Sequence, residues 1–596
     1  MCGILVQISP DKPVDPGLFQ QKRDTLRHRG PDGAGTWINE DHTVALGHRR
    51  LSFLDLSETG QQPMTNEDGT LWLTFNGEIY NYLELREELI GRGHQFGSDT
   101  DSEVIIHAYE EWGLDALQRL NGMFAFALWQ TTSRELLLAR DRYGIKPLYY
   151  GQLNGSLYAA SELKAILQGE SSRPNVSDRA IGQYLAYRFI PSPGTIWEGL
   201  YKVPPGHYVL FQPFGKKSPD ISSPRAYWEM PYPNPSREKD LPERVDALLS
   251  QSVRRHLRSD VPIGAFLSGG YDSSALVAYM REAGTTPNTF TIGFTNWSES
   301  EDQYAKMVAD HLGCPLKKTI VGKEQLSLLD TLVYHYDEPI ADISIIPTYM
   351  VSDLASRDRK AVFSGEGADE LFGGYWWQKK AATLPAWRYQ LEKWTDRFTR
   401  RHPSFMIEQY AEAMSMGRFT EHNLPDLLHP GRTEALDDYA DWFYATHYQD
   451  QLTPLKAFQR LDVRSFMGEL VLTKIDRASM AHSLEVRVPF LDNDLFDTVF
   501  PLPPKQFFRK DVTKYLLYEN LKHRLPKRIL DRPKQGFVGP DTYYMDIPWY
   551  AEVLRGGKLV NDQVIQSSAV DRLVREEKHW ELWKLAVLEK WMQHWT

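Results

Sequence analysis

The sequence is poor in cysteine: its 596 residues contain only two, Cys2 and Cys314. Two thiols cannot form a disulfide framework and would make a poor zinc site, so the composition favours a reducing compartment and argues against a structural metal. No apolar run approaches the ~18 residues of a membrane-spanning helix, and the N-terminus lacks the basic and apolar regions of a signal peptide. We therefore expect a cytoplasmic protein with no membrane partner.

Positive charge is also scarce, because Lys and Arg total 68 against 79 for Asp and Glu, a formal net charge of −11. Nucleic-acid-binding proteins usually leave a basic footprint, so we expect small-molecule substrates and no nucleic-acid partner. The hydrophobic content of 42% is ordinary for a globular chain. The length exceeds the size at which one core keeps growing, which predicts at least two domains.

The first 212 residues contain short apolar or alternating runs separated by Gly, Pro and Asn, for example 71–75 and 123–129. Such runs predict strands. Helical patterns lie between them at 82–91 and 102–112. We predict an α+β domain over 1–212, with helices packed on largely antiparallel sheets.

Residues 213–240 are rich in Pro, Ser, Lys and Asp and lack apolar periodicity, which predicts a linker. Strand-like and helical patterns then alternate, at 261–267, 273–282, 289–294 and 302–312. This alternation favours a doubly wound parallel sheet. From about residue 381 the pattern is mostly helical, so we predict an α/β domain over 241–596 with a helical C-terminal extension.

Cys2 would become the chain terminus if Met1 were removed. A terminal cysteine carries its own general base, because its α-amine has an unperturbed pKa of roughly 7.7 to 8.0 and lies within reach of the thiol. The alternative is that Cys2 belongs to an ordinary N-terminal strand. Cys314 follows a helical pattern and precedes Pro315, and we expect it to be an inert thiol.

Four further motifs supply what thiolate attack on an amide requires; they lie at 28–33, 48–52, 76–81 and 101–103. Asn76 and Gly77 can donate hydrogen bonds to the oxyanion of a tetrahedral intermediate, and glycine allows a close backbone approach. Arg50 suits the carboxylate of an amino-acid substrate, and Asp101 suits its ammonium group. Each feature also has an ordinary explanation, a turn for Asn-Gly and a solvated surface position for the arginine.

In their order these motifs resemble the glutaminase domain of class II amidotransferases, the N-terminal-nucleophile type, over about the first 210 residues. The resemblance implies that Cys2 releases ammonia from glutamine and that Asn76 and Gly77 form the oxyanion hole. It also implies that segment 28–33 closes over the site. The implied glutamine-binding residues are Arg50, Leu51, Ser52, Phe53, Leu54, Asn76, Gly77, Glu78 and Asp101.

A glycine-rich loop from Ser268 to Ser274 follows an apolar strand pattern and opens a helical one. Its backbone N–H groups and the helix dipole favour an anion such as phosphate, although Ser-Gly-Gly is also a common turn. The loop lacks the Gly-Lys-Ser/Thr ending of a Walker loop, which disfavours an ATPase that cleaves the γ-phosphate. Asp272, beside the phosphates, is best explained as a Mg²⁺ ligand.

A second glycine-dense loop, 363–375, follows the apolar run 361–363 and carries Glu366, Asp369 and Glu370. Carboxylates beside a phosphate loop would repel a nucleotide unless a cation lay between them. The pattern therefore predicts magnesium.

The first loop resembles the pyrophosphate loop of the ATP pyrophosphatase superfamily, and the second resembles an ATP-contacting motif of asparagine synthetases. The resemblance implies cleavage of ATP between its α and β phosphates, transfer of AMP to a carboxylate, and magnesium-bound pyrophosphate at Asp272 and Asp369. Glu366 matches the carboxylate associated with acyl-adenylate formation. The implied nucleotide-binding residues are Leu267, Ser268, Gly269, Gly270, Asp272, Ser273, Ser274, Ile292, Ser364 and Gly365.

Two C-terminal segments also fit asparagine synthetases. Lys474, or Arg477 if the register differs, would neutralise charge developing on the phosphates. The competing explanation for these cations is a structural ion pair with Asp476 or Glu485, and it applies equally to Arg487.

Three features have no assigned role. Segments 337–339 and 342–344 lie near the acceptor in the resembling family. Tyr271 stands where the pyrophosphate-loop pattern usually has Leu. It either packs against the neighbouring helix or reshapes the acceptor pocket, which leaves the acceptor open.

Together the halves resemble glutamine-hydrolysing asparagine synthetases across nearly the whole chain. This implies an N-terminal-nucleophile glutaminase domain that supplies ammonia, through an internal passage, to an acyl-adenylate of aspartate, with release of AMP and pyrophosphate. ATP and Mg²⁺ are the implied cofactors, and a homodimer is compatible with the resemblance. The alternatives are an amidotransferase for another carboxylate, such as a sugar uronate or a secondary-metabolite intermediate, a β-lactam-forming or other cyclising ligase with an idle head domain, and a non-catalytic binding protein.

Overall fold

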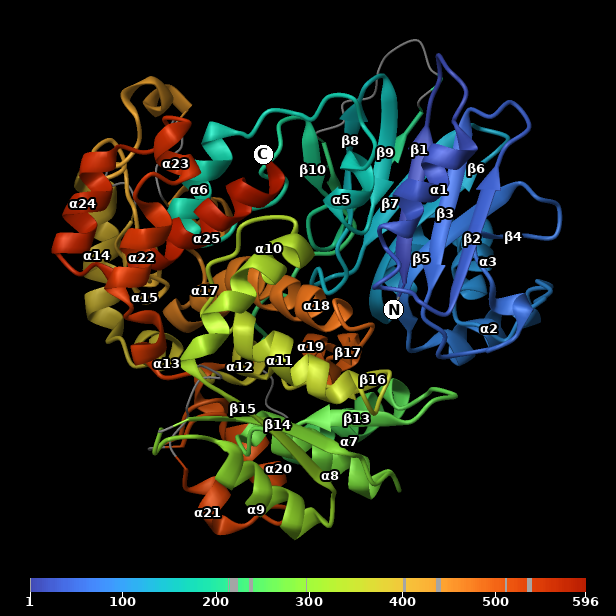
Figure 1. Cartoon of the computed structure of the whole chain (residues 1–596). Coiled ribbons are helices and arrows are strands. Elements are labelled where there is room, and N and C mark those ends of the chain that lie inside the picture. The colour runs from blue at the N-terminus through green and yellow to red at the C-terminus, as the bar shows by residue number, and fades with distance from the viewer. Residues whose placement is uncertain are drawn as a thin grey trace.

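The computed structural model describes residues 2–212, 214, 223–234, 240–295, 297–399, 404–435, 441–509, 512–532 and 539–596. Figure 1 shows the N-terminal part, in blue and teal, packed against the side of a larger body formed by the rest of the chain. Across these residues, no helix combines the length and the apolar character needed to cross a membrane.

Within the described residues, the N-terminal part contains two antiparallel sheets. The strands of the first are β1 (Gly3–Ile8), β2 (Gly33–Ile38), β3 (Val44–Arg50), β8 (Tyr149–Leu153), β9 (Ser156–Ala160) and β10 (Leu200–Lys202). Those of the second are β4 (Met64–Thr65), β5 (Leu71–Ile79), β6 (Gly122–Gln130), β7 (Glu135–Arg140), β11 (His207–Phe211) and β12 (Arg225–Ala226). Their orders are β10-β8-β9-β1-β3-β2 and β12-β11-β7-β6-β5-β4.

The helices of this part are α1 (Pro16–Asp24), α2 (Tyr82–Gly91), α3 (Glu103–Trp112), α4 (Ala116–Arg119), α5 (Leu163–Leu167) and α6 (Asp178–Tyr187). The sheets pack face to face because alternate strand residues point to opposite faces. Ile4, Val6 and Ile8 of β1 enter the core between the sheets. Leu5 lies in a different core, with residues of α1 and α5. Side chains of α2 and α3 share a core with β5 of the second sheet, so the predicted layers of helices on antiparallel sheets are confirmed.

The second part is built on a parallel sheet with the strands β13 (Ile263–Phe266), β14 (Thr289–Phe294), β15 (Leu316–Val321), β16 (Ala361–Phe363) and β17 (Glu485–Arg487). Helices α8 (Tyr271–Glu282), α9 (Asp302–Leu312), α10 (Leu329–Tyr336) and α11 (Ile345–Ser356) lie between successive strands along the chain. This confirms the doubly wound fold. Helix α8 begins two residues earlier than predicted, since Gly270 is its N-cap.

The strand order β15-β14-β13-β16-β17 reverses direction at β13, with β14 on one side and β16 on the other. Open α/β sheets bind ligands at the carboxyl ends of their strands at such a point. The loops that follow β13 and β16 are the two glycine-rich loops of the sequence. The topology therefore places them at the two sides of one crevice.

The chain beyond residue 381 is mostly helical, as predicted, but it also returns a strand to the sheet. Strand β17 pairs in parallel with β16 at the edge of the sheet. A π-helix over Asp462–Val471 joins two helices of this region. The remaining helices are α7 (Leu241–His256), α12 (Ala368–Phe372), α13 (Trp376–Ala382), α14 (Ala386–Thr399), α15 (Phe405–Ala413), α16 (Trp442–His447), α17 (Pro454–Leu461), α18 (Leu472–Met480), α19 (Asn493–Val499), α20 (Tyr515–Leu521), α21 (Lys527–Leu530), α22 (Ile547–Leu554), α23 (Lys558–Asn561), α24 (Ser567–Arg575) and α25 (His579–Trp595).

The predicted linker, 213–240, lies outside the described residues at 213, 215–222 and 235–239. Its described part includes β12, which pairs with β11 and extends the second antiparallel sheet beyond residue 212. The proposed domain limits of 1–212 and 241–596 stay a prediction.

Candidate active sites

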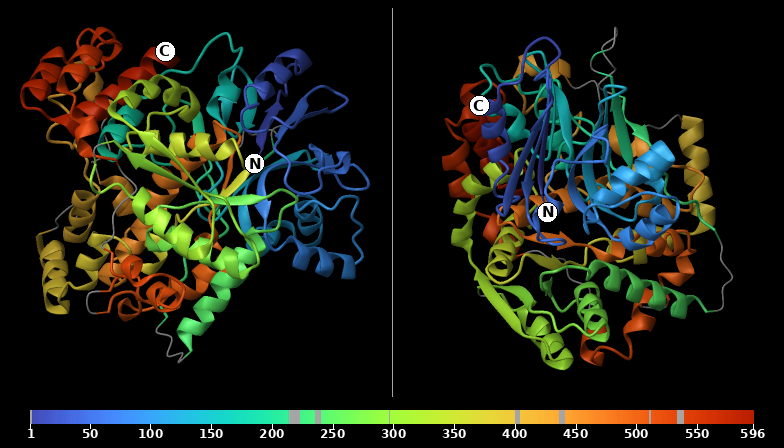
Figure 2. Two further views of the ribbon diagram at one scale, coloured as in Figure 1. Left: turned by 60° about the horizontal axis from the view of Figure 1, so that its bottom comes forward. Right: turned by 90° about the vertical axis from the view of Figure 1, so that its right-hand side faces the viewer.

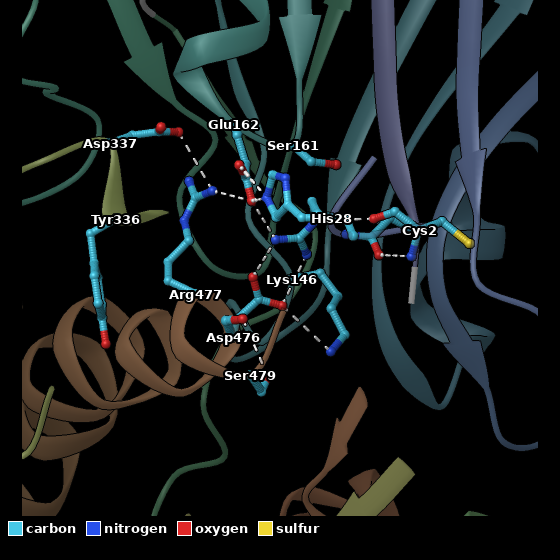
Figure 3. Close-up of polar contacts among 12 residues, drawn as sticks. Cys2, His28, Lys146, Ser161, Glu162, Tyr336, Asp337, Asp476, Arg477 and Ser479 are labelled. Atoms are coloured by element: carbon cyan, nitrogen blue, oxygen red, sulfur yellow. Dashed lines mark hydrogen bonds and ion pairs between the residues drawn. The ribbon is translucent and has the colours of Figure 1, made fainter. Parts of the chain in front are cut away.

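Cys2 lies directly before β1, and it is only 9% exposed. Its main-chain N–H donates to Asn76 Oδ1 at 2.9 Å, and its Sγ lies 4.0 Å from the carbonyl oxygen of Leu51. Figure 3 shows the sulfur on the side of Cys2 that faces away from the central ionic cluster. The fold therefore brings the predicted nucleophile next to the predicted oxyanion residue.

Burial raises the pKa of the Cys2 thiol above its ordinary value. A protonated thiol is a weak nucleophile, so attack on an amide requires a base close by. The nitrogen of Cys2 itself, held by Asn76 Oδ1, would be that base once Met1 is removed.

Asn76 retains an unused donor. Its Nδ2 is buried and has no hydrogen-bond partner among the described residues. A buried donor without a partner costs free energy unless a ligand uses it. The next residue, Gly77, lies so close to β6 that a Cβ there would overlap the carbonyl oxygen of Met123. Both features fit an oxyanion hole.

Two acids predicted for the glutamine site are buried on or beside β5. Asp101 Oδ2 accepts a hydrogen bond from the Ile79 N–H at 2.7 Å, and Glu78 Oε2 lies 3.3 Å from Arg487 Nη2. Burial raises the pKa of Asp101 to about 6 and raises the pKa of Glu78 well above its ordinary value. At neutral pH Asp101 is therefore mostly ionised and able to accept an ammonium group.

Arg50 ends β3, and its guanidinium holds the loop that follows. Nη2 donates to the carbonyl oxygen of Asp55 at 2.5 Å, and Nη1 donates to that of Ser57 at 2.9 Å. The predicted residues 51–54 form the first half of this loop. Part of the Arg50 guanidinium thus already makes hydrogen bonds within the protein. The role of Arg50 in binding a substrate carboxylate stays a prediction.

The nucleotide residues lie around the crevice of the parallel sheet. Leu267 follows β13 and Ile292 lies in β14, and both are at most 2% exposed. A Cβ at Gly365 would stand 2.9 Å from the Cβ of Asp272, so glycine lets the two loops approach. In the first loop, the N–H of Ser268 donates to Ser273 Oγ at 3.2 Å.

Asp272 and Asp369 converge on one cation. Lys514 Nζ lies 2.5 Å from Asp272 Oδ1 and 2.6 Å from Asp369 Oδ1. Burial alone would lower the pKa of Lys514, but the two carboxylates outweigh it and raise this pKa. In the structure the positive charge between the facing loops is the Lys514 ammonium, and magnesium at Asp272 and Asp369 stays a prediction.

Sequence reasoning did not find Lys514. Its segment has no glycine-rich pattern, and the residue adopts a left-handed conformation, with φ of 51°, at the start of α20. Packing of that helix brings it to the loops. The excess of acid in those loops is the one sequence signal that called for a cation there.

The predicted catalytic groups Glu366 and Lys474 each form a hydrogen bond with a nearby serine side chain. Glu366 accepts a hydrogen bond from the hydroxyl of Ser364. Lys474 Nζ donates to Ser344 Oγ at 2.8 Å, and that hydroxyl donates to Asp342. Burial raises the pKa of Asp342, but Lys474, Arg188 and the hydrogen bonds from Ser344 together outweigh this effect and lower it.

Arg477 belongs to a buried ion-pair network that joins the two parts of the chain (Figure 3). Its Nη1 lies 2.8 Å from Glu162 Oε1. Arg29 donates to Glu162 at 2.8 Å and to both oxygens of Asp476, at 2.9 and 3.1 Å. Arg29 Nε also donates to the carbonyl oxygen of Cys2 at 3.1 Å. Segment 28–33, predicted to close over the glutamine site, thus contributes directly to the interface.

The 337–339 segment takes part in the same interface. Asp337 Oδ1 lies 2.9 Å from Lys164 Nζ, and Glu338 Oε2 lies 3.0 Å from Lys202 Nζ. Burial raises the pKa of Glu162, but His28, Lys164 and Arg477 outweigh it and hold this pKa well below its usual range. The interface therefore stays charged at neutral pH.

Arg487 touches both candidate sites. Its carbonyl oxygen accepts from the N–H of Ser364 at 2.9 Å, and its guanidinium reaches Glu78. Nε also donates to Glu485 Oε1 at 2.5 Å, so the structural ion pair considered for this arginine is present. Strand β17 thus runs from the nucleotide crevice to the glutamine site.

Comparison with known proteins agrees with this arrangement. Residues 244–593 match the family described as asparagine synthase, and residues 1–228 match the glutamine amidotransferase domain. The chain belongs to the asparagine synthase family. "Asparagine synthetase [glutamine-hydrolyzing] 1" of Bacillus subtilis is 35% identical over 89% of this chain and 84% of its own length.

Two other relatives can be aligned with most of this chain. A putative glutamine-hydrolysing asparagine synthetase of Mycobacterium bovis is 33% identical over 97% of this chain and 94% of its own length. Amidase chry2 of Gibberella zeae is 28% identical over 93% of this chain and 91% of its own length. The chain is thus a glutamine-dependent amide-forming enzyme of the asparagine synthetase type, with ATP as the family's energy source.

The departure at Tyr271 has a local explanation. Its hydroxyl donates to the carbonyl oxygen of Leu530 in α21. This contact corresponds to the first alternative, packing against a neighbouring helix.

Replacing Asn76 by Asp tests the oxyanion hole of this synthetase. Asp keeps an oxygen for the N–H of Cys2 but has no Nδ2 donor, so we expect glutaminase kcat to fall by about 10²–10³. Glutamate release measures this loss. Asn561→Asp, at an exposed position, is the matched control; equal losses in both variants would contradict the assignment.

Replacing Asp476 by Asn tests the buried network. The change leaves Arg29 with an incomplete set of partners, and we expect a loss of about 3–5 kcal/mol in unfolding free energy. We also expect more glutamate released per amide formed, because a loosened interface loses ammonia to solvent. Thermal unfolding and product ratios measure both effects.

The control is Asp310→Asn, which breaks an exposed pair with Lys306 and should change stability by less than about 1 kcal/mol. An Asp476→Asn enzyme with unchanged stability and coupling would show that the network does not hold the two sites together.

Proposed function

We propose that this enzyme makes asparagine from aspartate, with glutamine as nitrogen donor and ATP as the source of activation. The observation that supports this proposal is that Cys2 lies beside an unused Asn76 donor, while Arg487 contacts both Glu78 of that site and Ser364 of the nucleotide loop. The names of the Bacillus and Mycobacterium relatives support the acceptor. A cytoplasmic location and the domain limits of 1–212 and 241–596 are part of the same proposal.

In the glutaminase site, the amine of Cys2 takes the thiol proton, and the thiolate attacks the side-chain amide carbon of glutamine. Asn76 Nδ2 and the Gly77 N–H stabilise the oxyanion. Ammonia leaves with the transferred proton, and water hydrolyses the thioester to glutamate. Asp101 and Arg50 hold the ammonium and carboxylate of the substrate.

In the synthetase site, an acceptor carboxylate oxygen attacks the α-phosphorus of ATP and pyrophosphate leaves. Ammonia then attacks the acyl carbon and AMP leaves, giving the amide. The backbone N–H groups of 268–274 and 364–365 bind the phosphates. Lys474 stabilises negative charge during these steps, since Arg477 is already engaged with Glu162.

Magnesium suits Asp272 and Asp369, because they come from facing loops and hard carboxylate oxygens suit Mg²⁺; the ion would join or replace the Lys514 ammonium that contacts one oxygen of each. These two residues would hold it. When bound, the metal neutralises charge on the pyrophosphate.

Another carboxylate acceptor is the second candidate. It is favoured by the fungal relative, which is named an amidase and still covers 93% of this chain. Glutamine and ATP handling would be the same for both acceptors, so only the acceptor itself separates them.

An acceptor panel with ammonia as nitrogen donor tests the proposal. We expect AMP, pyrophosphate and asparagine in equal amounts with aspartate and ATP. A sugar uronate and a set of other carboxylic acids serve as comparisons. Faster AMP formation with one of these acids would identify it, in place of aspartate, as the acceptor. Formation of ADP in place of AMP would reject adenylation.

Cys2→Ala separates the two sites. We expect glutamine-dependent synthesis to vanish and ammonia-dependent synthesis to persist, since the adenylating crevice lacks Cys2. Loss of both activities in a folded variant would contradict two separable sites.

The pKa of Asp101, raised to about 6 by burial, predicts a pH dependence. Below about pH 6 the carboxyl gains a proton and loses its attraction for the substrate ammonium. In a plot of log kcat/KM for glutamine against pH, kcat/KM should therefore fall more steeply below this pH, by one additional unit of slope. Asp101→Asn should lack this added limb. Glutaminase rates between about pH 5 and 8 measure it, and an identical bend in the variant would reject Asp101 as its source.

A further inference from the structure

Two histidines and a glutamate converge in the N-terminal part, beside the second antiparallel sheet. His94 lies in the segment between α2 and α3, and His107 and Glu110 lie on α3. Glu110 Oε2 lies 3.5 Å from His94 Nδ1 and 2.7 Å from His107 Nδ1. One ligand atom from each of the three side chains lies within 4.8 Å of the other two. None of the three belongs to either candidate active site.

These separations suit one small metal ion. Bonds of about 2.0–2.1 Å to an imidazole nitrogen and about 2.0–2.2 Å to a carboxylate oxygen place the ligand atoms of a tetrahedral site about 3.3 Å apart. The distances from Glu110 Oε2 to the two rings lie on either side of this value. Side-chain rotations would therefore bring all three atoms to one ion.

Each imidazole also has a carboxylate beside its other nitrogen. Glu111 Oε2 lies 3.3 Å from His94 Nε2, and Glu103 Oε1 lies 3.5 Å from His107 Nε2. Histidines that bind a metal almost always donate their remaining N–H to a carboxylate, a backbone carbonyl or water, which orients the ring and raises its basicity. This arrangement on both rings distinguishes the group from a chance grouping of charged surface residues.

Neighbouring residues hold the ligands in place. Asn66 Nδ2 donates to Glu110 Oε1 at 2.8 Å, so the other carboxylate oxygen is the one beside the imidazoles. The His107 side chain is only 1% exposed and packs edge-on against Phe96, with ring centroids 4.6 Å apart. Ligands that are already oriented lose less conformational entropy when they bind an ion.

The charge of the surroundings favours a cation. The carboxylates of Glu103, Glu110 and Glu111 surround two rings that must be neutral to bind a metal. One cation, Arg92, contacts this group, with Nη1 2.8 Å from Glu111 Oε1. A divalent ion would therefore reduce an excess of negative charge. The alternative is a protonated His107 that forms ion pairs with Glu103 and Glu110.

We propose that His94, His107 and Glu110 bind a divalent transition-metal ion, with Zn²⁺ as the member of that class that suits them. Imidazole nitrogen suits Zn²⁺, whereas Mg²⁺ and Ca²⁺ prefer oxygen ligands. Zn²⁺ has no geometric preference from its d electrons, and it accepts three protein ligands with water as the fourth. The low cysteine count argued against a structural metal, but this ligand set uses no cysteine.

The ion would fasten the connection between two helices. His94 follows the end of α2, while Glu103, the first residue of α3, accepts hydrogen bonds from the N–H groups of Gly97 and Ser98 at 2.7 and 2.8 Å. An ion that joins His94 to α3 would therefore hold the start of a segment whose end is already held by Glu103. We expect the ion to stabilise the N-terminal part.

The ligands are accessible from solvent. Figure 1 places α2 and α3 on the right-hand side of the molecule, and the right-hand view of Figure 2, in which that side faces the viewer, shows these helices in light blue toward the front. The side chains of His94 and Glu110 are 17% and 24% exposed. An ion can therefore reach the ligands without passing through either active site.

Titration of the full-length Cys2→Ala chain with Zn²⁺, against a chromophoric chelator, tests the site. This variant removes the terminal thiol, which is a competing zinc ligand, and excess Mg²⁺ competes for the oxygen ligands proposed at Asp272 and Asp369. We expect one Zn²⁺ per chain, bound in the micromolar range or more tightly. X-ray absorption should show imidazole nitrogens about 2.0–2.1 Å from the metal and no sulfur at about 2.3 Å.

Variants in the same Cys2→Ala chain identify the ligands. His94→Ala and Glu110→Gln should each weaken binding by at least about 100-fold, and Glu111→Gln, which changes only the partner of His94 Nε2, should weaken it by about 10-fold. His422→Ala is the matched control, because it removes an exposed histidine that lies 3.7 Å from Glu421. It should bind Zn²⁺ as the parent does.

Thermal unfolding checks that the variants fold. Zn²⁺ should raise the Tm of the Cys2→Ala parent, because it binds the folded chain. His94→Ala should lose this rise while its metal-free Tm changes little. A parent chain that binds no Zn²⁺ would overturn the proposal and leave the group as ion pairs of a protonated His107. Binding that survives both His94→Ala and Glu110→Gln would overturn it as well, and so would sulfur bound to the metal.

Discussion

The arrangement of the two sites depends on charge that is buried where the two parts of the chain meet. Removing Arg29, Glu162 and Asp476 from water costs free energy that only close, correctly oriented partners recover. Arg29 meets that condition with both oxygens of Asp476 and with Glu162. Few relative positions of the two parts allow this geometry. Because the same guanidinium binds the carbonyl oxygen of Cys2, the position of Cys2, the proposed nucleophile, is tied to the docking of the second part.

A second connection runs through the sheet of the synthetase part. Strand β17 places the carbonyl oxygen of Arg487 on the N–H of Ser364 and its guanidinium beside Glu78. Arg487 therefore forms a short, buried link between Ser364 of the nucleotide loop and Glu78 of the candidate glutamine site. In the proposed function ammonia is made at one end of this link and consumed at the other, so Arg487 connects the two proposed sites.

The elements and motifs of this chain were largely predictable because they are local. Helices at 82–91 and 302–312 and the strand at 289–294 appear at their predicted limits, since apolar periodicity and flanking glycine act within a few residues. The crevice was predictable for the same reason: each of its glycine-rich loops carries its own signal. Lys514 was not, because only the packing of α20 brings it to Asp272 and Asp369. The pairing of β17 with β16 was also not predictable, because this short strand lies in a mostly helical region and joins the sheet only through tertiary packing.

By itself, the sequence determined which chemical groups are available: a thiol next to the chain start, an amide donor at Asn76, and two glycine-rich loops that carry carboxylates. These depend on residue type and short spacing. The tertiary structure decided which charges pair. It assigned Arg477 to Glu162 and left Lys474 with Ser344, and it turned the acidic segment 337–339 into part of the interface. A charged residue that pairs within the protein and one that faces a substrate look the same in the sequence. Only burial and distance in the folded structure distinguish them.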